Sequence, residues 1–143
     1  MIQSELWNAH RASAIGVTLA AALGMSLVSF TTAHADTASI VGSWAGSGSV
    51  SFSTGTKEGA KCRARFSRNG ATSFVMTASC ATASARVDQS AEIRKVGANS
   101  YAGNFFNEQY NTGGQIRITV NGRIQTVRLS GEAGSAVFTL SKR

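Results

Sequence analysis

Apolar and polar side chains alternate along residues 61–68 and again along residues 74–80. Alternation with a period of two is typical of β-strands that bury one face. A hairpin that sets Cys62 opposite Cys80 gathers the apolar side chains of both segments on one face. That register requires a loop of about five residues around Asn69-Gly70, because a two-residue turn would invert the alternation. The sequence therefore predicts two antiparallel strands with a shared inner face.

Shorter alternating segments follow each other along the rest of the chain, separated by Gly, Asn and Ser turns and without helical periodicity. We expect strands over residues 42–52, 91–96, 101–106, 116–120, 124–129 and 136–140, and a short edge strand over 86–88. Eight or nine short strands in this order predict an all-β domain, a small antiparallel meander. A closed β-barrel of about eight strands is favoured over an open sandwich because closure removes the exposed edges.

One predicted hairpin has conflicting signals. A simple turn at Asn121-Gly122 pairs Val120 with Arg123 and leaves Ile124 on the face opposite to Val120. A β-bulge near Gln125 would bring the two strands back to one inner face.

The first 35 residues have the features of a signal peptide. A polar start that contains Arg11 precedes an apolar run, Ala12–Phe30, and Ala33-His34-Ala35 forms a small-x-small cleavage pattern. We expect cleavage after Ala35, a single barrel domain over 36–143 and a periplasmic or secreted protein. A retained membrane anchor is the alternative, since the apolar run approaches the length that spans a bilayer. After processing we expect no membrane-spanning segment.

Export makes a disulfide the expected state of Cys62 and Cys80, which are the only cysteines in the chain. Both histidines, His10 and His34, precede the predicted cleavage point. Residues 36–143 therefore offer no histidine for a catalytic triad, a metal site or a pH switch. We expect neither a metal nor a cofactor.

The predicted mature domain is basic, with thirteen Lys and Arg against six carboxylates. A positive surface favours anionic partners. Its carboxylates are scattered without the paired spacing that a glycosidase needs. The sequence therefore predicts a binding protein and no enzyme.

Three short sequences carry a resemblance to known proteins. Gly42-Ser43-Trp44 on the first strand, with a disulfide and a meander, resembles the calycin group: lipocalins, avidins and small bacterial metalloprotease inhibitors. Residues 44–48 and Cys62-Arg63-Ala64 resemble small exported proteins of alphaproteobacteria. The calycin resemblance implies an up-and-down barrel that binds a ligand or inhibits a protease.

Two surface segments are candidate sites. A basic stripe, which we define as Lys61, Arg63, Arg65 and Arg68, projects cations that could bind the phosphates of an anionic polymer; the alternative is a solvated strand face that blocks edge pairing. An aromatic and polar loop offers contacts for a sugar or a peptide through Phe106, Asn107, Glu108, Tyr110 and Asn111; the alternative is that Phe105 or Phe106 belongs to the core and the rest is a connection.

The predicted function is an exported, non-enzymatic binding module for an anionic cell-envelope polymer or lipid, or for a small ligand. Nucleic acid is not the expected partner. The alternative function is a protein–protein role such as inhibition of a periplasmic protease, in which the arm 36–40 would enter the active-site cleft. An apolar cavity inside the barrel would favour the small ligand.

Overall fold

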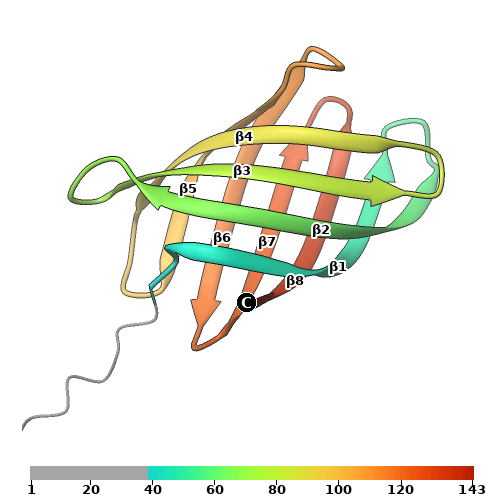
Figure 1. Cartoon of the computed structure of the whole chain (residues 1–143). Helices are drawn as coiled ribbons and strands as arrows, with labels where there is room; N and C mark the ends of the chain where they lie inside the picture. The colour runs from blue at the N-terminus through green and yellow to red at the C-terminus, as the bar shows by residue number, and fades with distance from the viewer. Residues whose placement is uncertain (1–38) are drawn as a thin grey trace, which may run out of the picture. The chain divides into compact units, whose positions relative to one another are not determined.

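The computed structural model describes residues 39–143, which form one closed antiparallel barrel (Figure 1). Eight strands follow in chain order: β1 (Gly42–Phe52), β2 (Lys57–Arg68), β3 (Ser73–Thr82), β4 (Arg86–Lys95), β5 (Ser100–Asn107), β6 (Thr112–Asn121), β7 (Ile124–Gly131) and β8 (Gly134–Lys142). Each strand pairs with the next, and β8 pairs with β1 to close the barrel. The predicted all-β meander barrel is confirmed. The predicted signal peptide, residues 1–35, lies outside the described residues.

The hairpin of β2 and β3 has the predicted register. Cys62 pairs with Cys80, and Arg68 with Phe74, which leaves residues 69–73 as the connecting loop. The two cysteines form a disulfide whose Cα atoms are 4.1 Å apart. The predicted Cys62–Cys80 disulfide is therefore confirmed.

Strand β4 corrects one prediction. It is not a short edge strand over 86–88 but a ten-residue strand that pairs with β3 on one side and β5 on the other. Its apolar signal is weak because two of its inward positions, Val87 and Gln89, face a cavity and not a packed core.

The β6–β7 hairpin shows that the predicted β-bulge near Gln125 is wrong. The turn consists of Gly122 and Arg123, so Asn121 pairs with Ile124 in an unbroken ladder. No bulge occurs near Gln125, which itself faces inward. Gly122 has a φ of 62°, a left-handed conformation that glycine adopts without steric cost.

The packed core fills one end of the barrel, which we call the closed end. The turns of β2–β3, β4–β5 and β6–β7 lie there, together with the start of β1 (Figure 1). Trp44 is buried and donates a hydrogen bond of 2.8 Å from Nε1 to the backbone oxygen of Ile40. The side chain of Ile40 has no exposed surface, so the segment that enters β1 is part of the core.

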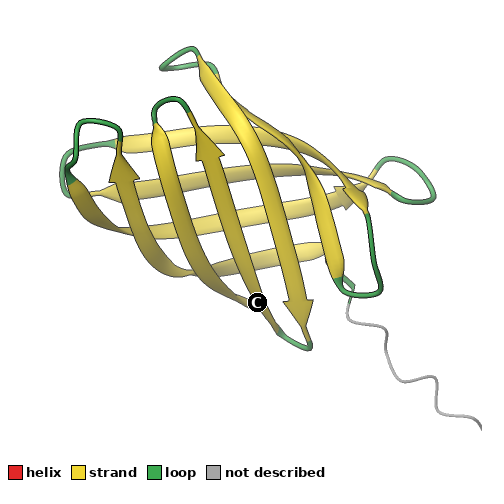
Figure 2. Ribbon diagram, turned by 180° about the vertical axis from the view of Figure 1, so that it is seen from behind, coloured by secondary structure: helices red, strands yellow, loops and turns green. Residues whose placement is uncertain are grey.

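Strands β2–β4 and β6–β8 cross at a steep angle on opposite sides of the barrel (Figure 2). Strand β1 joins the two groups, and two glycines on its inner face allow β8 to approach closely. A Cβ atom at Gly46 would lie 2.0 Å from the backbone oxygen of Thr139, and one at Gly48 would lie 1.9 Å from that of Val137. The alternating glycines of β1 therefore permit the close β1–β8 contact that closes the barrel.

Candidate functional site

The opposite end of the barrel, which we call the open end, contains an internal cavity of about 400 Å³. The loops 53–56, 83–85, 108–111 and 132–133 surround this end. Inward-facing apolar side chains supply most of the cavity wall: Val50, Val87, Phe105, Leu129, Ala136 and Phe138. The volume lies within the usual range of small-molecule sites, roughly 300–1,000 Å³.

Two amide side chains line the cavity and have different roles. Asn107 is buried, donates from Nδ2 to the backbone oxygen of Asp88 at 3.0 Å and accepts from the backbone nitrogen of Tyr110 at 2.7 Å. Both polar atoms of its amide are thus used to hold the β5–β6 loop. Gln89 is half-buried on the inner wall and offers the amide that a ligand could bind.

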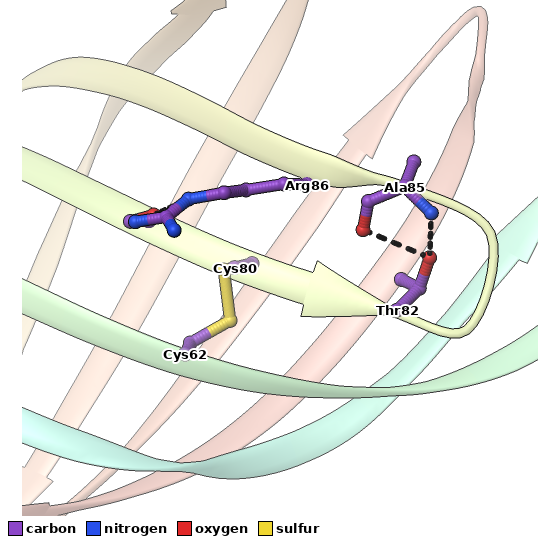
Figure 3. The surroundings of a disulfide bond; sticks show 6 residues. Cys62, Cys80, Thr82, Ala85 and Arg86 are labelled. Carbon is purple, nitrogen blue, oxygen red and sulfur yellow. Dashed lines mark hydrogen bonds between the residues drawn. A yellow bond between two sulfur atoms is a disulfide. The ribbon is translucent and has the colours of Figure 1, made fainter.

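A short polar cluster holds the rim of the cavity beside β2. Ser84 Oγ lies 2.8 Å from both carboxylate oxygens of Glu58. Thr82 Oγ1 accepts from the backbone nitrogen of Ala85 at 3.1 Å and lies 3.3 Å from its oxygen, closing the β3–β4 turn next to the disulfide (Figure 3). Hydrogen bonding by the Thr82 side chain, and secondly by Ser84, holds the pKa of Glu58 below its ordinary value.

The predicted aromatic and polar loop divides between three environments. Phe106 faces outward and is 45% exposed, whereas Asn107 is buried. Glu108, Tyr110 and Asn111 are exposed around the open end, and Tyr110 lines the cavity mouth. Of these five residues, Asn107 and Tyr110 reach the cavity.

The basic stripe does not form one surface. Lys61, Arg63 and Arg65 project from the outer face of β2, as the alternation predicts. Arg68 belongs to the other face; it donates to the backbone oxygen of Ala71 at 2.8 Å and lies over the ring of Phe74. Arg63 and Arg65 instead border a broad hollow of about 1240 Å³ on the outer wall, across from Asp88.

Residues 36–40, the arm of the inhibitor hypothesis, are described only from Ser39 onward. Ile40 is fully buried and its backbone oxygen accepts the Trp44 hydrogen bond. Ser39 accepts a hydrogen bond of 2.8 Å from Lys142 Nζ. The described end of the arm is thus fixed to the barrel, and an extended arm would have to end before Ser39.

Reasoning from the sequence missed most of the cavity. Its wall comes from every strand except β2, and the inward positions there mix glycine, alanine, threonine and glutamine with larger apolar residues. The only available signal was the small residues on the inner faces of the first and fourth strands. That signal does not distinguish a cavity from tight coiling.

Two further observations concern residues 39–143. They contain no group of three His, Cys, Asp or Glu residues placed to hold a metal ion. Within the same range no helix has the length and apolar character that crossing a membrane requires.

Several solved structures share the fold. The redesigned β-barrel mFAP1, bound to DFHBI, superimposes with a TM-score of 0.60 and 12% sequence identity over 72% of this chain and 94% of that chain. The redesigned barrel mFAP0, also bound to DFHBI, superimposes with a TM-score of 0.60 and 12% sequence identity over 71% of this chain and 97% of that chain. A de novo designed fluorescence-activating β-barrel superimposes with a TM-score of 0.56 and 10% sequence identity over 72% of this chain and 93% of that chain.

No protein-family model matches the sequence, and no curated protein matches it. At such low identities the structural similarity concerns the fold alone. It agrees with the closed antiparallel barrel that the sequence predicts.

Proposed function

We propose that this protein binds a small, mainly apolar molecule in the cavity at the open end of the barrel. The observation that carries the proposal is the cavity itself, about 400 Å³ of space among inward-facing apolar side chains. Burial of apolar ligand surface in such a space is favourable by roughly 25 cal/mol per Å². Designed barrels of the same fold have been solved with DFHBI bound, so the architecture can hold a small molecule.

The wall of the cavity suggests which ligand would fit. Phe105 and Phe138 provide aromatic surface, and Gln89 provides one hydrogen-bonding group. A ligand with an apolar body and one carbonyl or hydroxyl group would satisfy both. A densely charged ligand would leave its charges unpaired inside the barrel, which is costly.

A cavity-filling variant tests the proposal. Ala136 lies on the inner wall, and Ala136→Phe would place a ring in the cavity. The neighbouring residue on the same strand, Val137, faces outward, so Val137→Phe adds similar bulk outside and is the matched control. Using the neutral fluorophore Nile red as the probe, we expect Ala136→Phe to weaken binding at least tenfold and the control to bind as the wild type does.

Gln89→Leu is a second variant that does not depend on tolerance of a large ring. It should strengthen binding of a pure hydrocarbon probe and weaken binding of a probe with a carbonyl group, because the amide partner is lost. Unchanged binding by both Ala136→Phe and Gln89→Leu would refute the proposal. If the two variants change binding as expected, mass spectrometry of solvent extracts of the purified protein would identify the natural ligand.

A second candidate function rests on the outer wall. Arg63 and Arg65 border the hollow of about 1240 Å³, where an anionic cell-envelope polymer could lie across serine and threonine side chains. Asp88 on the far side of this hollow opposes that role. Replacing both arginines with serine should weaken polymer binding and flatten its salt dependence, since each phosphate contact releases counterions. Polymer binding that is unaffected at high salt in this double variant would exclude the outer wall.

A further inference from the structure

The closed end of the barrel carries a concentrated positive charge. Six Lys and Arg residues lie at the strand ends and turns of this end: Arg68, Arg94, Lys95, Arg123, Lys142 and Arg143. No Asp or Glu occurs in its turns 69–72, 96–99 and 122–123, nor within three residues of them. We call this surface the basic end.

Hydrogen bonds between separate turns hold the basic end in one arrangement. The backbone nitrogen of Lys95 donates to Thr72 at 2.9 Å, and that of Lys142 donates to Arg123 at 2.9 Å. Arg123 returns a bond from Nη2 to the backbone oxygen of Lys142 at 3.1 Å. The cations therefore project from a fixed platform and not from independent loops.

Two exposed apolar side chains stand among these cations. Val96, at the β4–β5 turn, is 62% exposed, and Ile124, at the β6–β7 turn, is 44% exposed. Val96 directly follows Arg94 and Lys95, and Ile124 directly follows Arg123. Apolar tips surrounded by Lys and Arg match the interface of an anionic bilayer, where the cations meet the headgroups and the apolar groups enter between them.

The open end has no such excess of positive charge, because its carboxylates nearly balance Lys57 and Arg86, the first residues of β2 and β4. Three of the five side-chain carboxylates of residues 39–143 lie at its loops or rim, namely Glu58, Glu108 and Glu132. A negative surface would therefore attract the basic end much more strongly than the open end. Ser39, whose backbone oxygen accepts from Lys142 Nζ, also lies at the basic end.

We propose that the basic end docks on an anionic phospholipid membrane surface, which leaves the open end and its cavity facing away from the bilayer. This docking does not depend on occupation of the cavity. It differs from polymer binding by the outer wall, because other residues make the contact and because apolar insertion contributes.

Sedimentation of the full chain with lipid vesicles tests the proposal. Vesicles of equal parts phosphatidylglycerol and phosphatidylcholine should bind more tightly than pure phosphatidylcholine, and salt should weaken the difference. The double variant Arg94→Gln/Lys95→Gln should weaken binding roughly thirtyfold. The double variant Arg63→Gln/Arg65→Gln removes the same charge from the outer wall and should change binding less than threefold.

Amide hydrogen exchange of the vesicle-bound protein reports on each segment of the barrel separately. It therefore locates the contact within residues 39–143, whatever residues 1–38 contribute to vesicle binding. The turns 96–99 and 122–123 should gain protection on anionic vesicles, whereas the loops 83–85 and 108–111 should not. Val96→Ser/Ile124→Ser should weaken vesicle binding and leave binding to the soluble polyanion heparin unchanged. All substituted side chains are exposed, so the thermal midpoint checks that each variant folds.

Three results would overturn the proposal. The first is equal binding to both vesicle compositions, and the second is an equal loss of binding in the Arg63/Arg65 and Arg94/Lys95 double variants. The third is a Val96→Ser/Ile124→Ser variant that binds vesicles as the wild type does, together with wild-type protein that binds heparin as tightly as anionic vesicles. The last result would identify a site for soluble polyanions and not for a membrane.

Discussion

Val120 of β6 pairs with Gln125 of β7 across the two-residue turn of Gly122 and Arg123. This register places the Gln125 side chain inside the barrel with no exposed surface, while its neighbour Ile124 lies outside. Neither polar atom of the Gln125 amide has a hydrogen-bond partner among residues 39–143. An apolar position in the closed end is thus occupied by a polar group.

We predict that Gln125→Leu stabilises the protein. Burial of an unpaired amide costs about 1–3 kcal/mol, and leucine has a similar size without the polar atoms. Urea denaturation should show an increase of about 1 kcal/mol or more in the free energy of unfolding. Gln115→Leu on the outer face of β6 is the matched control and should change it by less than about 0.5 kcal/mol. A less stable Gln125→Leu variant would show that the amide has a partner.

The disulfide makes a second prediction. Cys62 and Cys80 are 18 residues apart in sequence, and closing a loop of that length stabilises the folded state by on the order of 3 kcal/mol. The double variant Cys62→Ala/Cys80→Ala should lose about this amount in urea denaturation. Wild-type protein measured under reducing conditions should show a similar loss; an unchanged midpoint in both experiments would contradict the prediction.

The third prediction concerns Ile40, in the segment that leads into β1. Ile40 is fully buried beside Trp44, so Ile40→Ala should lower the free energy of unfolding by about 2–5 kcal/mol. Ser39→Ala is the control, since the serine is exposed, loses only the hydrogen bond that its Oγ accepts from the Val41 nitrogen, and keeps the backbone oxygen that accepts from Lys142. If Ile40→Ala leaves the unfolding midpoint unchanged, the segment is not part of the core. Truncation through Ile40 would therefore test stability as well as inhibition.

The sequence predicted those parts of the fold in which several local signals agree. For β2 and β3, the alternation and the two cysteines both require the same register, and the structure has it. For β6 and β7, the alternation placed Ile124 outside, but an assumed bulge then moved it inside. The Asn121-Gly122 pair is consistent with more than one turn position. With Gly122 and Arg123 as the turn, Val120 pairs with Gln125 and both face inward, so no bulge is needed.

The candidate site was predicted less well because a cavity is a property of packing and not of any one strand. Small inward residues are compatible with tight coiling at Gly46 and Gly48 and also with the space beside Val87 and Ala136. Only the closed arrangement of eight strands decides between the two. The basic end was missed for the same reason, since its cations come from four separate strand ends.

The last prediction concerns the acid range and the rim of the cavity. Hydrogen bonding by the Thr82 and Ser84 side chains lowers the pKa of Glu58 from its ordinary value in the folded protein. A lowered folded-state pKa means that the contribution of Glu58 to stability is present above its unfolded pKa and is lost as the pH falls through the folded pKa. The rim contact of Ser84 and Glu58 should therefore persist at neutral pH and open only in acid.

NMR titration of the Glu58 carboxyl group should give a pKa lower than that of an ordinary exposed glutamate, and Ser84→Ala should raise it because one donor is lost. Glu58→Gln should reduce the fall in stability on acidification while leaving the cavity lining unchanged. Glu132 at the β7–β8 turn provides the control, and Glu132→Gln should not alter the titration of Glu58. A Glu58 pKa in the wild type that is not lowered from the ordinary value would show that the hydroxyl groups do not hold the carboxylate in solution.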